Sequence, residues 1–93
     1  MKKTIEYILV TQDKNRSKIH NILSQFEITC YSIKKLTGCW QGELEQSLAI
    51  QIIDTGIDKI NPVIVDCIAQ EIKVQNDQDY VLVEKRELEY SLL

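Results

Sequence analysis

Two glutamates and a tryptophan near the middle of the chain are the residues best placed to do chemistry. Glu43 and Glu45 are two positions apart, and Trp40, the only tryptophan, precedes them. On a strand, side chains two apart point to the same face, so these carboxylates could act as a general acid and base or hold a cation. Trp40 could stack on a ligand. The structural alternatives are a solvated strand end for the glutamates and an aromatic ring folded over its own sheet for Trp40.

The cysteines and the single histidine give no metal or catalytic motif. Cys30, Cys39 and Cys67 are odd in number and widely spaced, which fits neither a disulfide framework nor a zinc site. We expect Cys30 and Cys67 to be small buried residues, and Cys39, in a turn, to be the most reactive. His20 could form a multi-histidine site only on the axis of a trimer. Nucleophile elbows, phosphate-binding glycine loops and dinucleotide fingerprints are absent, so no catalytic residue is assigned.

The length of 93 residues predicts a single globular domain, residues 1–93. Apolar residues make up 44% and charged residues 27%, and the net charge of -3 provides no general field for a nucleic-acid backbone. No run approaches the roughly 20 apolar residues that span a bilayer. Glu6 interrupts the apolar run after the N-terminal lysines, which argues against a signal peptide. With its thiols reduced, the protein is expected to be cytoplasmic and free of membrane partners.

The first half of the chain alternates between strand and helix patterns. Residues 4–11 are apolar at both odd and even positions, which predicts a strand covered on both faces. Residues 13–26 follow a helical period, with Asp13 or Asn15 as the N-cap. Residues 28–36 and 43–54 predict two antiparallel strands joined by a turn at Gly38 to Gly42. The expected core face of the second comprises Leu44, Leu48, Ile50 and Ile52.

The second half predicts a helix followed by strands. Asn61-Pro62 predicts a capped helix start, and the following apolar stripe contains Ile64, Cys67, Ile68 and Ile72. A polar break at 75–79 precedes a strand at 80–83. After polar residues 84–87, the alternation of Leu88, Tyr90 and Leu92 predicts a short extra C-terminal strand, which could pair within the chain or with a neighbour's edge.

These elements predict an α+β fold, the ferredoxin-like β-α-β-β-α-β two-layer sandwich with a short extra C-terminal strand. Both helices then lie on one face of the sheet. Since the strands at 4–11 and 80–83 are apolar on both faces, something must cover the other face. A second copy of the chain is the simplest candidate, so we expect a homo-oligomer.

The pattern Gly38-x-Trp40-x-Gly42-Glu43-x-Glu45-x-Ser47, with Gln78-x-x-Val81-Leu82 after the second helix, resembles two groups. One is the CutA-like and nitrogen-regulatory PII-like superfamily of trimeric ferredoxin-like proteins. The other is a set of uncharacterised small bacterial and phage proteins. The resemblance implies a trimer. Polar residues 75–79 replace the His-Pro-Tyr segment of CutA, and residues 36–43 leave no room for the long PII loop. These departures argue against copper binding and against ATP or 2-oxoglutarate sensing, and no cofactor is assigned.

Three functions follow. The first is a ligand- or partner-binding regulatory protein, a PII/CutA-like homotrimer with sites at the subunit clefts built from Trp40, Glu43, Glu45 and Gln78. The second is a phage- or plasmid-type interaction module that docks on a host protein without a small-molecule ligand. The third, ranked last, is an enzyme that uses the two glutamates.

Overall fold

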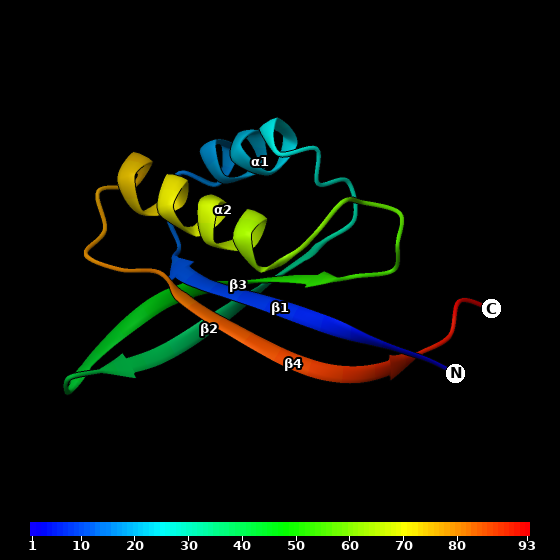
Figure 1. Ribbon diagram of the computed structural model, residues 1–93. Helices are drawn as coiled ribbons and strands as arrows, with labels where there is room; N and C mark the ends of the chain where they lie inside the picture. The colour runs from blue at the N-terminus through cyan, green and yellow to red at the C-terminus, as the bar shows by residue number, and fades with distance from the viewer.

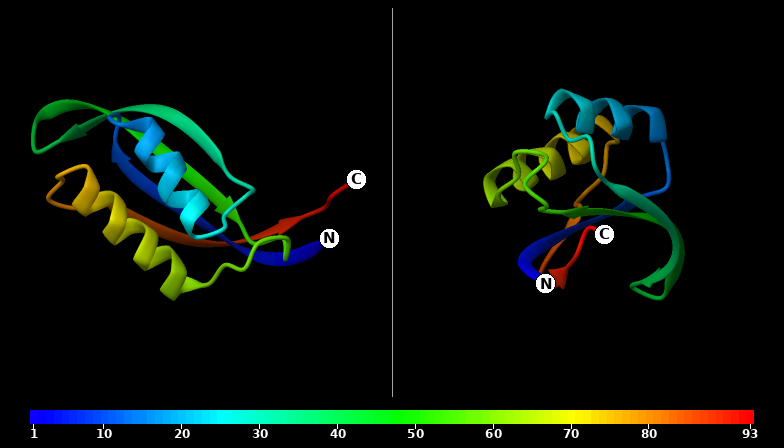
Figure 2. Two further views of the ribbon diagram at one scale, coloured as in Figure 1. Left: turned by 90° about the horizontal axis from the view of Figure 1, so that it is seen from above. Right: turned by 90° about the vertical axis from the view of Figure 1, so that its right-hand side faces the viewer.

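A computed structural model describes all residues, 1–93, as one four-stranded sheet and two helices (Figure 1). The elements in chain order are β1 (Lys2–Gln12), α1 (Arg16–Gln25), β2 (Ser32–Trp40), β3 (Glu43–Ile53), α2 (Pro62–Gln75) and β4 (Leu82–Tyr90). The strand order is β2-β3-β1-β4, and neighbouring strands are antiparallel. Both helices lie on the same face of a strongly twisted sheet (Figure 2). The predicted α+β ferredoxin-like fold is confirmed. Neither helix is long and apolar enough to cross a membrane.

The core lies between the helices and one face of the sheet. On β3, Leu48, Ile50 and Ile52 are at most 1% exposed, as their spacing predicts. Leu44 was expected on the same core face, but it is 80% exposed because it lies near the hairpin tip, beyond the reach of the helices. The remaining core side chains come from β1, both helices and the segment after α1: Tyr7, Leu9, Ile19, Ile22, Leu23, Ile28, Val65, Ile68, Ala69 and Ile72.

The side-chain cap predicted for α2 is formed, whereas the one predicted for α1 is not. Asn61 caps α2 as predicted: its side chain accepts a hydrogen bond from the backbone N–H of Ile64 at 3.0 Å, and Pro62 follows it. Asn15 precedes α1 in the left-handed conformation and makes no side-chain cap. Its side chain instead donates to Oδ1 of the buried Asn76 at 3.2 Å, and Asn76 donates to the carbonyl of Lys14 at 3.2 Å. This amide pair joins the start of α1 to the end of α2.

The turn between β2 and β3 is tighter than predicted. Gly38 is not a turn residue but lies within β2, opposite Glu45. Only Gln41 and Gly42 connect the strands, and both have positive φ, +50° and +83°. This is the requirement of a two-residue type I′ hairpin turn, which glycine meets without steric cost. The hairpin register therefore places Trp40 directly opposite Glu43.

The prediction of a short extra C-terminal strand is wrong. Residues 82–90 form one continuous strand, β4, paired with β1 from Val10↔Leu82 to Lys2↔Tyr90. Leu88 and Tyr90 belong to the second half of this strand. The polar residues 84–87 do not interrupt it, because an edge strand can place charged side chains in solvent while its backbone pairs with β1.

The face of the sheet without helices, called here the helix-free face, carries apolar side chains on all four strands. In the register, its central members Ile8 and Val10 of β1 lie opposite Gln51 and Ala49 of β3. Leu36 of β2 and Leu82 of β4 are 40% and 50% exposed. Glu6, on the same face, is 7% exposed and accepts a hydrogen bond from the side chain of Gln51. The expectation of apolar residues on both faces of β1 therefore holds in the structure.

Candidate functional site

A cleft of about 240 Å³ lies between the β2–β3 hairpin and the segment that enters β4. The end of β1 contributes its third wall. Three of the four predicted ligand-binding residues line this cleft, namely Trp40, Glu45 and Gln78. The fold thus brings together in one chain two residues that are 38 positions apart, Trp40 and Gln78, whereas the sequence predicted a site at the clefts between subunits.

Trp40 closes one side of the cleft against Tyr80. Their ring centroids are 5.2 Å apart and the ring planes are inclined at 47°, a tilted aromatic contact. The rings remain about half exposed, 52% for Trp40 and 48% for Tyr80. Trp40 therefore does not fold into the core of its own sheet. It bridges the hairpin to the α2–β4 segment and keeps part of its surface open to solvent.

Gln78 holds the α2–β4 segment against β1. Its side-chain oxygen accepts a hydrogen bond from the backbone N–H of Gln12 at 3.1 Å, and its Nε2 donates to Oγ1 of Thr11 at 2.5 Å. Thr11 is 2% exposed, so this contact fixes Gln78 to a buried part of the strand. The amide is engaged with the protein at both of its atoms. Gln78 therefore shapes the wall of the cleft by holding the α2–β4 segment in place.

The two predicted glutamates are placed differently. Both lie on the helix-free side of β3, since their partners in the register are Trp40 and Gly38 of β2. Glu45 lines the cleft and is partly buried, whereas Glu43 lies at the hairpin tip, exposed, outside the cleft lining. A paired acid–base site built on both carboxylates would need them in one enclosed space. The geometry therefore places only Glu45 where a ligand in the cleft would meet it.

Gly38 forms part of the cleft lining opposite Glu45. A Cβ built at this position would have no atom within 4 Å, and its φ is not in the positive range. The absence of a side chain therefore keeps space open inside the cleft and is not required by the backbone. This makes Gly38 a position at which the cleft can be filled without strain.

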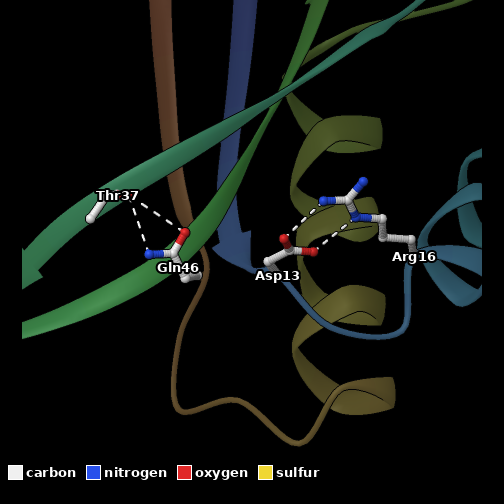
Figure 3. Close-up of polar contacts among 4 residues, drawn as sticks. All are labelled: Asp13, Arg16, Thr37 and Gln46. Atoms are coloured by element: carbon white, nitrogen blue, oxygen red, sulfur yellow. Dashed lines mark hydrogen bonds and ion pairs between the residues drawn. The ribbon is translucent and has the colours of Figure 1, made fainter.

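Figure 3 shows two polar contacts near the cleft, one between Thr37 and Gln46 of the hairpin and one between Asp13 and Arg16 after β1. The Nε2 of Gln46 donates to Oγ1 of Thr37 at 3.2 Å across the two strands. The backbone N–H of Asp13 donates to the carbonyl of Gln46 at 3.0 Å. Arg16 donates to both carboxylate oxygens of Asp13 at 2.8 Å, and this bond holds the pKa of Asp13 below its usual value.

Sequence reasoning missed two residues of the cleft that carry chemistry. Asp79 and Tyr80 line it beside Gln78, although the sequence assigned residues 75–79 to a polar break and Tyr80 to the start of a strand. Burial, reinforced by the negative charges of Glu45 and Asp79, raises the pKa of Tyr80. The phenol is therefore harder to ionise than that of an ordinary tyrosine. The sequence does contain one indication of their role, because Asp79 and Tyr80 directly follow Gln78, a predicted site residue.

The other candidate residues lie outside the cleft, except Cys39, which is in its lining. Cys30 and Cys67, expected to be buried, are both exposed: Cys30 precedes β2, and Cys67 lies on the solvent side of α2. The Nδ1 of His20 is 2.5 Å from the hydroxyl of Tyr31 on the surface. No three side chains of the metal-binding types histidine, cysteine, aspartate and glutamate gather in this chain to hold an ion.

Comparison by sequence gives no relatives. No protein-family model matches the chain, and no curated protein matches it. Comparison by structure finds many chains of similar fold. CPII, a nitrogen regulatory PII-like protein from Thiomonas intermedia K12 whose structure is described as bound to ADP, AMP and bicarbonate, superposes with a TM-score of 0.67 at 9% identity, covering 99% of this chain and 97% of CPII. The chain has a PII-like fold.

Two further structures with this PII-like fold come from other bacteria. The GlnK–ATP complex of B. subtilis superposes with a TM-score of 0.65 at 16% identity, covering 92% of this chain and 82% of GlnK. A DUF3240 family protein from Shewanella baltica OS155 gives 0.62 at 10% identity, covering 100% and 96%. The predicted PII-like resemblance is confirmed as a likeness of fold. The resemblance to CutA-like and phage proteins stays a prediction.

Proposed function

We propose that this protein is a small regulatory protein that binds a ligand in the cleft beside Trp40 and assembles as a homotrimer. The single observation that carries the proposal is the cleft itself. Two segments far apart in the chain, the β2–β3 hairpin and the α2–β4 segment, meet there around an exposed aromatic pair. Small-molecule sites are typically concave, partly apolar and supplied with a few convergent polar groups, and this cleft has each of these properties.

The PII-like fold supports a binding role over an enzymatic one. The solved structures with this fold include proteins named as nitrogen regulatory and described as bound to ADP, AMP, bicarbonate or ATP. In this chain the predicted acid–base pair is not assembled, because Glu45 lines the cleft and Glu43 lies outside it. We therefore assign binding without turnover. The proposal keeps the cytoplasmic location expected from the three unpaired thiols.

The homotrimer is proposed from the apolar side chains of the helix-free face. Leu36, Trp40 and Leu82 on this face are 40%, 52% and 50% exposed, and the central side chains Ile8 and Val10 are only half-buried in the single chain. Grouped apolar side chains on one face are typical of a surface buried by association. A second copy that packs there would also adjoin the cleft, since Trp40 and Leu82 belong both to the helix-free face and to the cleft lining.

Light scattering coupled to size-exclusion chromatography tests the assembly. We expect a mass three times that of the 10.8 kDa chain. Leu36→Glu places a charge on the helix-free face and should dissociate the trimer. Leu44→Glu is the matched control: it introduces the same change on the same hairpin, but on the opposite face at a position already 80% exposed. A wild-type chain that stays monomeric at high concentration would contradict the trimer and favour the docking module.

Ligand binding is tested by thermal shift and by the fluorescence of Trp40, the only tryptophan. A panel of nucleotides, bicarbonate, divalent metals and small amines should contain at least one class that raises the melting temperature, because a ligand bound only by the folded state stabilises it. Gly38→Leu should abolish that shift by filling the cleft, where a Cβ meets no other atom. A melting temperature that no compound changes would contradict the ligand site, and a shift that survives Gly38→Leu would place the ligand elsewhere.

A further inference from the structure

The charges around the cleft have one sign. Its twelve lining residues include two carboxylates, those of Glu45 and Asp79, and no lysine, arginine or histidine. Neither carboxylate is in an ion pair or accepts a side-chain hydrogen bond; the two ion pairs of the chain are Asp13–Arg16 and Glu84–Arg86, both elsewhere. The negative charge in the cleft is therefore not neutralised by the protein that surrounds it.

The field of these carboxylates acts inside the cleft. Burial is the larger cause of the raised pKa of Tyr80, and the negative charges of Glu45 and Asp79 add to it. The two carboxylates that act on this phenol come from two different segments, β3 and the α2–β4 connection, and line the same cleft. A ligand that occupies the space beside Tyr80 meets the same field, which opposes an anion and attracts a cation.

The aromatic pair adds a second preference for positive charge. Trp40 and Tyr80 stand 5.2 Å apart with tilted planes, and each keeps about half of its surface exposed. The faces of tryptophan and tyrosine rings attract ammonium and guanidinium groups through the ring quadrupole. Val10 and Leu82 complete the lining with aliphatic surface. A charged head beside a carboxylate and an apolar stem along these side chains would both be accommodated.

We infer that the cleft between Trp40, Tyr80, Glu45 and Asp79 binds a small organic cation, an amine or guanidinium carried on a short apolar stem. This inference rests on the proposed ligand site and specifies the chemical class of its ligand. A volume of about 240 Å³ suits a molecule of a few carbon atoms with one charged head. Phosphate-bearing ligands are disfavoured in this cleft, because their charge would face two carboxylates without a basic side chain in the lining.

Titration of the full-length protein with agmatine and n-butylamine tests the inference, with n-butanol as the neutral match of butylamine and AMP as the anionic probe. Trp40 fluorescence and calorimetry are the readouts. We expect the two cations to bind and butanol and AMP not to. Binding should weaken as salt is raised, since a charge interaction at a partly exposed site is screened.

Two substitutions locate the cation. Glu45→Gln and Asp79→Asn should each raise the Kd for agmatine by about tenfold, the loss of one favourable charge contact with a partly desolvated ligand. Glu89→Gln is the matched control, because it removes the same charge from an exposed position of β4 outside the cleft lining, and it should change the Kd by less than about twofold. Circular dichroism of each variant checks that the fold is unchanged.

Three results would overturn the inference. If AMP binds and quenches Trp40 while the amines do not, the cleft is a ligand site for anions, with basic groups supplied by a neighbouring copy, and the proposed function survives without this inference. If agmatine binds equally well to the wild type and to both variants, the cation lies elsewhere. If neither amine binds and a lysine-rich peptide, titrated in the same way, does bind, the cleft recognises a partner protein and not a small molecule. A flat response to cations, anions and neutral compounds alike would count against the proposed ligand site itself.

Discussion

The carboxylate of Asp58, at one end of this molecule, is hydrogen-bonded to the protein, whereas the two cleft carboxylates at the other end are not. At the end formed by the loops after α1 and before α2, Asp58 accepts three hydrogen bonds: from the N–H of Thr29 at 2.8 Å, from its hydroxyl at 2.6 Å and from the N–H of Cys30 at 2.9 Å. At the other end, where the hairpin and the α2–β4 segment lie (Figure 2), Glu45 and Asp79 have no such partners.

This difference indicates that Asp58 stabilises the fold, whereas the cleft carboxylates do not. Asp58 joins two loops that are far apart in the chain, and its donors stabilise the ionised form, chiefly the Thr29 hydroxyl, so that its pKa is lowered. The three hydrogen bonds engage both carboxylate oxygens, so Asp58 contributes to structure. The cleft carboxylates contribute nothing comparable to the fold. Their charge remains available to whatever enters the cleft.

The largest expected effect is at the structural end. Asp58→Ala should lower the free energy of unfolding by about 2 kcal/mol, because it leaves the donors of Thr29 and Cys30 without their acceptor. Urea denaturation followed by circular dichroism measures the change. Thr29→Val, which removes only the hydroxyl donor, should cost less than Asp58→Ala. Equal stability of Asp58→Ala and the wild type would show that the loops do not depend on this carboxylate.

Gln78 lies at the cleft end of the molecule, but its side chain is hydrogen-bonded to β1, as that of Asp58 is to the loop after α1. Its substitution therefore tests whether one residue can serve both the fold and the cleft. Gln78→Ala should cost about 1 kcal/mol in stability, since it removes the hydrogen bonds to Gln12 and Thr11. It should also weaken ligand binding by loosening the cleft wall. Gln75→Ala, which removes an exposed amide bonded only to Glu71 within α2, is the control and should leave binding unchanged.

Acid titration tests the contribution of Asp58 to stability. The folded-state pKa of Asp58 lies below its ordinary value of 3.8, so its contribution to stability is complete above that pH and is lost as the pH falls through the folded-state value. The stability difference between wild type and Asp58→Asn should therefore be constant near neutrality and shrink below about pH 4. Urea midpoints measured across this range provide the test. A difference that grows in acid would have the wrong sign for this carboxylate.

The smallest expected effect is at the cleft. Glu45→Gln and Asp79→Asn should change the free energy of unfolding by no more than about 0.5 kcal/mol, because neither carboxylate holds a partner in the folded chain. The same urea experiment measures it. A large loss of stability in either variant would mean that the carboxylate serves the fold, which would remove the contrast with Asp58 and weaken the case for a ligand there.

Much of the architecture could be predicted because it depends on periodicity. The alternation at Leu48, Ile50 and Ile52 identifies a core face wherever the strand is placed, and Asn61-Pro62 starts a helix through local geometry alone. Predictions failed where burial depended on distant parts of the chain. Leu44 follows the same alternation but lies beyond the helices. The polar residues 84–87 predict a break between two strands, although β1 provides hydrogen-bond partners along the whole of β4.

The sequence by itself predicted the β-α-β-β-α-β order, the apolar faces that must be buried and a candidate site of Trp40, Glu43, Glu45 and Gln78, and it also predicted an extra C-terminal strand that the structure does not contain. Only the tertiary structure decided that Trp40, Glu45 and Gln78 share a cleft with Asp79 and Tyr80, and that Glu43 stays outside it. The reason is physical: local patterns fix which side of a strand a residue faces, whereas a site is made by segments that meet across the sheet. The twist of the sheet and the two-residue hairpin turn set where that meeting occurs.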